Sequence, residues 1–148
     1  QTGELLGELC AQYQGHTAAA DRTVTITSCS DQVIVSDKRL LLRVLGNMVK
    51  NALEASNQGD TVSVACTRND ENVTFTVHNA AVMPEEVQLQ VFQRSFSTKA
   101  QSGRGIGTYS MKLFGETYLA GEVGFTSTPS EGTTFYLSIP KELRVSRE

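Results

Sequence analysis

The chain has 148 residues, a formal net charge of −3, 39% hydrophobic residues and 20% charged residues. These values are ordinary for one globular domain, which at this length buries roughly two-thirds of the surface that its unfolded chain exposes. The negative net charge argues against a broad surface that binds nucleic acid or an anionic membrane, so any phosphate-binding site must be local. Neither an apolar run of about 18 residues nor a signal-peptide pattern occurs, and we expect a cytoplasmic protein without membrane contact.

The three cysteines, Cys10, Cys29 and Cys66, are far apart in the sequence. They lack the close pairs that are typical of zinc sites and redox motifs. We therefore expect three reduced thiols, as in a cytosolic protein. The chain also begins without a methionine, which indicates a fragment of a longer protein.

The first part of the chain has weak helical character followed by strand patterns. Apolar residues at helical spacing over 4–12 and the small residues after them predict that 1–20 are the end of a preceding helix and a linker. Two β-branched runs, at 23–27 and 32–35, predict short strands on either side of a polar turn.

The strongest helical pattern covers residues 38–56, with Asp37 as the expected N-cap. One face of this helix is apolar throughout. The neighbouring face begins apolar and becomes polar halfway along, at Asn47, Asn51 and Glu54. This change of character within one face is the first indication of a functional site.

The second half alternates strand and helix patterns. Apolar and polar residues alternate in four segments, which predict strands at 61–67, 72–78, 123–127 and 133–139. Between the second and third of these, the pattern predicts a short helix from Pro84, a polar mobile loop at 94–104 and a helix at 108–119.

Together these elements predict an α/β fold. Five or six strands with three or four helices favour a two-layer α/β sandwich, in which helices cover one face of a mixed, mostly antiparallel sheet. We expect this domain at residues 21–141, followed by a charged tail at 142–148.

Three separate features indicate phosphate chemistry. Asn47 and Asn51 are four residues apart, so both carboxamides lie on one helix face, where their oxygens can ligate a hard cation such as Mg²⁺. The alternative is a pair of ordinary surface asparagines. Glycine-rich residues 103–107 directly precede a helix, so their amides and the positive helix end can meet phosphate oxygens, although a flexible loop has the same composition.

The third feature is the segment FQRSFSTK at residues 92–99. Its phenylalanines are suited to anchoring a loop, while Ser97, Thr98 and Lys99 offer hydrogen-bond donors to phosphate. The alternative is a solvated lysine beside core phenylalanines.

The order of these segments carries a family resemblance. LLRVLGNMVKNALEAS resembles the N-box of histidine kinases, FQRSFSTK their F-box, GRGIGTYSMKLF their second glycine box and EGTTFYLSIP their closing glycine box. Over about 33–140, the chain thus resembles the ATP-binding catalytic domain of a bacterial two-component sensor histidine kinase, of the GHKL superfamily. The resemblance implies the Bergerat-type fold, with ATP and Mg²⁺ as cofactors.

The resemblance also assigns site residues. It implies that Asn51 is the magnesium ligand, that Asn47 assists at the phosphates and acts in catalysis with Lys99, and that Thr133 lies near the adenine. The remaining positions that it implies in nucleotide binding are Asn79, Ala81, Met83, Ser97, Thr98, Gly103, Arg104, Gly105, Ile106, Gly107 and Thr108.

The first glycine box departs from the family pattern. Asn79 stands where the family has an aspartate that accepts a hydrogen bond from the adenine amino group, and Ala81 stands at the first glycine position. Neither that glycine nor the second one is present. An asparagine can accept from the adenine amine but lacks the charge that strengthens such a bond. We expect weaker ATP binding than in the family, or a changed base preference.

The resemblance implies transfer of the γ-phosphoryl group to a histidine on a separate dimerisation domain, and from there signalling to a response regulator. His16 and His78 lack the surroundings of the family's acceptor histidine. The isolated domain is expected to be monomeric and unable to phosphorylate itself, within a homodimeric parent whose membrane anchoring the sequence leaves open. Two alternatives remain: a degenerate nucleotide-binding or interaction module, and a serine kinase acting on an anti-sigma partner.

Overall fold

The computed structural model describes residues 2–14, 23–29, 34, 36–56, 59–69, 71–83, 88 and 111–140. Its elements are α1 (Thr2–Gln14), β1 (Thr23–Cys29), α2 (Lys38–Ala55), β2 (Thr61–Arg68), β3 (Asn72–Asn79), η2 (Phe114–Tyr118), β4 (Glu122–Thr128) and β5 (Gly132–Pro140). Within these residues, no helix is both long and apolar enough to cross a membrane.

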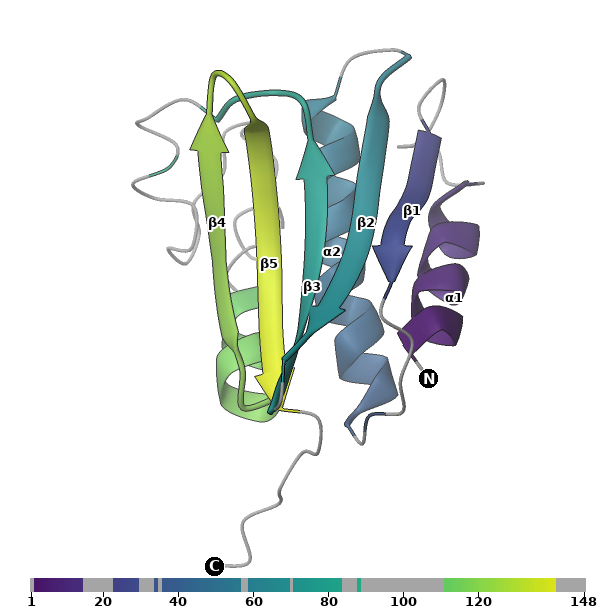
Figure 1. Cartoon of the computed structure of the whole chain (residues 1–148), viewed down its shortest axis with the longest axis vertical. Coiled ribbons are helices and arrows are strands. Elements are labelled where there is room, and N and C mark those ends of the chain that lie inside the picture. The colour runs from purple at the N-terminus through teal and green to yellow at the C-terminus, as the bar shows by residue number, and fades with distance from the viewer. Residues whose placement is uncertain are drawn as a thin grey trace, which may run out of the picture.

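The strands form one sheet in the order β1-β2-β3-β5-β4. β1 runs parallel to β2, and the other neighbouring strands are antiparallel. Figure 1 shows the helices on one face of this sheet, with α2 behind its centre and α1 at the β1 edge. The predicted two-layer architecture with a mixed, mostly antiparallel sheet is confirmed.

Side-chain hydrogen bonds cap both ends of helix α2. The Asp37 carboxylate accepts a hydrogen bond from the Leu40 amide (3.1 Å), which satisfies one of the amide groups that the first turn leaves without a partner. At the other end, the Ser56 hydroxyl donates to the carbonyl of Ala52 (2.6 Å). The expected N-cap is therefore confirmed, and the helix ends one residue before the predicted position.

The core lies between the sheet and the helices. Alternate residues of β2 and β3 face the helices, as predicted, and are at most 1% exposed: Val62, Val64, Cys66, Val73, Phe75 and Val77. From α2, the buried residues are Leu41, Val44, Leu45, Gly46, Met48, Val49, Ala52 and Leu53. The apolar face expected from the sequence does not extend to Ala55, the last residue of the helix, which is exposed.

Helix α1 belongs to the same core. Its residues Leu5, Leu6, Leu9 and Tyr13 are buried. The Tyr13 ring lies against α2 at Gly46, where an added Cβ would be 2.8 Å from the phenol oxygen. Burial raises the pKa of Tyr13. The expected boundary of the domain at residue 21 remains a prediction.

Two local features differ from the predicted elements. Ile34, the described residue of the strand expected at 32–35, lies outside any strand. The helix expected at 108–119 ends in the wider π-helical turn η2, in which the Leu119 amide donates to the Phe114 carbonyl (2.9 Å) across five residues. Gly115 fits this turn because an added Cβ would lie 2.3 Å from Val123 Cγ2.

The end of β3 and the start of β5 approach each other closely at Gly132. This glycine has φ +77, and a Cβ there would lie 2.3 Å from the carbonyl oxygen of Asn79 and 2.8 Å from that of Ala80. Glycine is required both for the left-handed backbone and for the contact.

We predict that Gly132→Ala lowers the free energy of unfolding by about 2 kcal/mol or more, since it adds left-handed strain and displaces the Asn79 carbonyl. The control is Gly7→Ala, because Gly7 lies in α1 with no atom within 4 Å of an added Cβ. This change should stabilise by about 0.5–1 kcal/mol. Urea denaturation of both variants measures the difference, and equal stabilities would contradict the role given to Gly132.

Candidate functional site

Three predicted site regions meet at one end of the domain. Helix α2 ends at Ala55, shortly before β2 begins at Thr61, and β2 pairs antiparallel with β3, so the last residues of β3 lie at that same end. The turn between β4 and β5 lies there too, because Asn79 pairs with Thr133. Figure 1 shows these ends together at the top of the molecule.

Asn79 is the last residue of β3 and is 2% exposed. Its side-chain nitrogen Nδ2 is buried and has no hydrogen-bond partner among the residues that the structure describes. A buried donor without an acceptor costs about 1–3 kcal/mol, and folded proteins rarely retain one without a reason. The Asn79 amide is therefore a candidate donor for a ligand acceptor at this end of the sheet.

A chain of hydroxyl groups holds the backbone beside Asn79. The Thr133 hydroxyl donates to the Ala81 carbonyl (2.8 Å) and lies 2.7 Å from the Ser127 hydroxyl. Because Thr133 has one hydroxyl hydrogen, Ser127 is the donor of the second bond. Ser127 in turn accepts from the Met83 amide (2.7 Å), so β4 and β5 fix residues 81–83 at both ends.

Met83 is held from a second direction. Its carbonyl accepts a hydrogen bond from Gln88 Nε2 (2.7 Å). Ala81 and Met83 are half-buried, whereas Thr133 is 4% exposed. The structure thus brings the predicted site residues Asn79, Ala81, Met83 and Thr133 together.

The missing glycines do not strain this segment. Across the described part of the chain, Ala120 is the non-glycine residue with positive φ (58°). Ala81 and Val82 therefore adopt backbone conformations that ordinary residues tolerate. These two positions therefore do not require the glycines of the family pattern.

The polar half of α2 supplies the second group of predicted residues. Asn47, Asn51 and Glu54 are half-buried, beside the buried Met48 and Ala52. Within the described ranges, no three His, Cys, Asp or Glu side chains gather to hold a metal ion. A cation here would take amide oxygens such as that of Asn51, with further oxygens from a bound ligand, which suits a hard ion such as Mg²⁺.

The remaining predicted residues lie outside the described part of the chain. These are Ser97, Thr98, Lys99, Gly103, Arg104, Gly105, Ile106, Gly107 and Thr108. Their assignment to phosphate binding stays a prediction.

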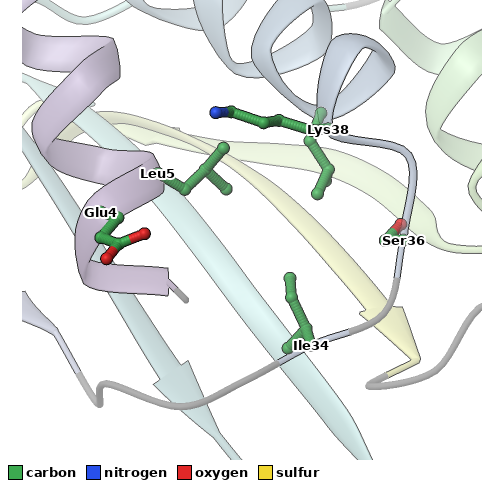
Figure 2. A pocket seen from close by; sticks show the side chains of 6 residues that line it. Glu4, Leu5, Ile34, Ser36 and Lys38 are labelled. Carbon is green, nitrogen blue, oxygen red and sulfur yellow. The ribbon is translucent and has the colours of Figure 1, made fainter.

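A separate pocket lies between α1 and the start of α2, with a volume of about 260 Å³. Figure 2 shows its lining, which is Glu4, Leu5, Ile34, Ser36, Lys38 and Leu41. The predicted site residues do not line it. The volume is below the range of about 300–1,000 Å³ that is typical of ligand sites, and we do not assign it a ligand.

Comparison with known proteins places this geometry in a family. The family model for histidine kinase-, DNA gyrase B- and HSP90-like ATPases matches residues 36–143. The chain belongs to this family. It has the catalytic-domain type found in sensor histidine kinases, as the sequence predicts.

Two sensor proteins illustrate the relationship. The chain is 32% identical to the sensor protein DegM of Bacillus sp. (strain B21-2) over 127 residues, which cover 84% of this chain and 34% of DegM. It is 26% identical to the sensor protein SrrB of Staphylococcus aureus (strain MRSA252) over 144 residues, which cover 93% of this chain and 24% of SrrB. The chain thus spans about a third of DegM and about a quarter of SrrB.

Solved structures agree on the fold. The catalytic domain of histidine kinase ThkA has a TM-score of 0.80 and 22% identity, with 97% of this chain and 95% of that one covered. A structure of ThkA in complex with response regulator protein TrrA has a TM-score of 0.76 and 21% identity, with 94% of this chain and 40% of that one covered.

Sequence reasoning missed Ser127, which joins Thr133 to the Met83 amide. The available signal was the turn between the last two predicted strands, because residues flanking a tight antiparallel turn face each other across it. Ser127 pairs directly with Thr133 in the β4–β5 register. The pattern could thus have indicated the pair, but not its contact with the distant residues 81–83.

We predict that Thr133→Val lowers the free energy of unfolding by about 1–3 kcal/mol. The change removes the hydrogen bonds that the Ala81 carbonyl and the Ser127 hydroxyl make to Thr133. Thr134→Val is the matched control, since alternation along β5 places Thr134 on the other sheet face, and it should change stability by less than about 0.5 kcal/mol. Thermal unfolding of both proteins measures the contrast. An equal loss of stability in the two variants would show that the hydrogen bonds of Thr133 do not stabilise the fold.

Proposed function

We propose that the domain binds Mg-ATP at the end of β3 and positions the γ-phosphate for transfer to a histidine on a separate domain. The observation that carries this proposal is the buried Asn79 amide, whose Nδ2 has no partner in the described part of the chain. It stands where the family pattern has its adenine-binding side chain. The family match supports ATP as the nucleotide.

The base would lie against Asn79, Thr133 and the segment 81–83. The Watson–Crick edge of adenine presents one amino donor and one ring-nitrogen acceptor. An asparagine side chain has the complementary pair, with Oδ1 accepting from the amine and Nδ2 donating to the ring nitrogen. This pairing would satisfy the Nδ2 group, which has no bond to any described residue.

The same amide also suits guanine, with its two ends exchanged. Guanine offers a carbonyl acceptor and a ring N–H donor, so Nδ2 would donate to the carbonyl while Oδ1 accepts from the ring. An aspartate carboxylate only accepts, and thus disfavours the guanine carbonyl. Asn79 therefore allows both purines with a smaller preference between them.

At the phosphate end, Asn51 would ligate the metal and Asn47 would contact the phosphates from the same face of α2. Ser97, Thr98, Lys99 and residues 103–108 would complete this part of the site. Magnesium supplies neutralisation of phosphate charge and fixes the phosphate geometry. The side chains supply position, because transfer of this kind needs the reacting groups in line rather than a covalent intermediate on the domain.

The acceptor would be a histidine on a dimerisation domain, followed by a response regulator. The reported complex of ThkA with the response regulator TrrA supports this kind of partner. We place the domain on the cytoplasmic side, where such partners and ATP are found. Purified domain mixed with a separately produced acceptor domain would then transfer phosphate to it, and no transfer despite nucleotide binding would reject the kinase role.

We predict that Asn79→Asp raises the ratio of ATP to GTP affinity by roughly tenfold. The carboxylate strengthens the bond from the adenine amine and repels the guanine carbonyl, worth about 1–1.5 kcal/mol. Calorimetric titration of both nucleotides measures the ratio. Asn72→Asp, at the opposite end of β3, is the control and should leave it unchanged. An unaltered ratio in Asn79→Asp would contradict the proposed placement of the base.

We predict that Asn51→Ala removes most of the magnesium dependence of nucleotide affinity, a loss of about tenfold or more. The control is Arg39→Ala, because Arg39 is exposed in the first turn of the same helix, at its other end. Titrations with a non-hydrolysable ATP analogue, with magnesium and with EDTA, give the comparison. Equal magnesium dependence in all three proteins would rule out Asn51 as the ligand.

A further inference from the structure

Cys29 and Cys66 are far apart in the sequence but adjacent in the sheet. Their sulfur atoms are 3.0 Å apart, in side chains from the neighbouring strands β1 and β2. Cys66 is 1% exposed and Cys29 is half-buried, and both are thiols in this structure. The three cysteines are free thiols, as expected from the sequence, but two of them are neighbours in space.

A bulge in β1 creates this pairing. The first residues of β1 pair in the register Thr23↔Thr61, which continued unchanged would place Ser28 opposite Cys66. The register shifts by one residue between Ile26 and Ser28, and Cys29 then faces Cys66. Because side chains alternate between sheet faces, this single extra residue brings Cys29 to the face of Cys66.

The geometry suits a covalent bond. Directly opposed residues in neighbouring strands have Cα atoms about 5 Å apart, within the range of about 4.4–6.8 Å found in disulfides. The two sulfurs need to approach by only about 1 Å to reach bonding distance. We propose that Cys29 and Cys66 form a reversible disulfide that joins the edge strand β1 to β2 when the domain meets a peroxide.

The half-buried position makes Cys29 the attacking thiol and Cys66 the resolving one. The Cys29 thiol gives up its proton and its sulfur attacks one oxygen of hydrogen peroxide. The O–O bond breaks, the leaving hydroxide takes up that proton, and a sulfenic acid and one water form. The Cys66 sulfur then attacks the Cys29 sulfur, the S–O bond breaks, and a second water leaves. Two thiols are oxidised by two electrons in total, and one peroxide is reduced to two waters.

The disulfide would also affect a contact between the sheet and helix α1. The Cys29 sulfur also lies 3.8 Å from the hydroxyl of Thr2, which is fully buried in the first turn of α1. Movement of Cys29 toward Cys66 changes this contact between α1 and β1. The redox state of the pair is thereby linked to the packing of α1 on the sheet edge.

The test is oxidation of the reduced protein by hydrogen peroxide, followed by alkylation and mass spectrometry. We expect loss of two of the three thiols, a disulfide-linked pair of peptides containing Cys29 and Cys66, and full recovery with dithiothreitol. Burial raises the pKa of Cys10, which lowers its thiolate fraction, so this thiol should resist the peroxide and be alkylated after the oxidised protein is denatured. Continued alkylation of both Cys29 and Cys66 after oxidation, or a bond to Cys10, would overturn the proposal.

Cysteine variants test whether the disulfide requires Cys29 and Cys66 in particular. Cys29→Ser should abolish the disulfide, whereas the matched change Cys10→Ser should leave it intact. Cys29 is half-buried and tolerates serine more readily than Cys66, and circular dichroism checks that both variants fold. A disulfide that still forms in Cys29→Ser would refute the assignment.

The melting temperature provides a second readout. A cross-link across 37 residues restricts the unfolded chain, so the oxidised protein should melt about 5 °C or more above the reduced one. A lower melting temperature would show that the bond forms only in a distorted sheet, and would contradict the geometry argued from β1.

Discussion

The structure depends on the close contact between the last residue of β3 and the first residues of β5. Gly132 allows the two backbones to meet, since any side chain there would collide with the Asn79 carbonyl. This approach sets Thr133 opposite Asn79 and within reach of Ala81. The same contact that completes the sheet therefore also builds the corner in which the Asn79 amide is buried.

The hydroxyl chain explains how this corner tolerates an altered glycine box. Two hydrogen bonds hold the backbone of residues 81–83 in place. Thr133 donates to the Ala81 carbonyl, and Ser127 accepts from the Met83 amide. The corner is thus held by hydrogen bonds within the protein. If a purine binds there as proposed, this preformed geometry would lower the ordering cost of binding and would offset part of the affinity that an uncharged Asn79 gives up.

Much of the fold could be predicted because its signals are local. The periodicity of α2, its Asp37 cap and the alternation along β2 and β3 follow from neighbouring residues, and the structure reproduces them. The placement of Asn47 and Asn51 on one helix could be predicted for the same reason. The family resemblance rests on the order of the motifs along the chain, which local patterns do not contain.

Other features depend on contacts between distant segments and could not be predicted. The bond between Ser127 and Thr133 is local, but its reach to residues 81–83 depends on how β3 and β5 pair. Likewise, the bulge that places Cys29 opposite Cys66 is a property of the β1–β2 register and leaves no trace in the spacing of the cysteines.

The most direct test of the account is the NMR signal of the Asn79 side-chain amide. Isotope-labelled protein would be titrated with a non-hydrolysable ATP analogue and magnesium, with Asn79→Ala used to assign the signal. A base bound at the end of β3 gives Nδ2 a hydrogen-bond acceptor, so the account predicts a large shift of the Asn79 amide protons that saturates with nucleotide. Saturable binding that leaves this amide unshifted would contradict it, because the nucleotide would then lie elsewhere.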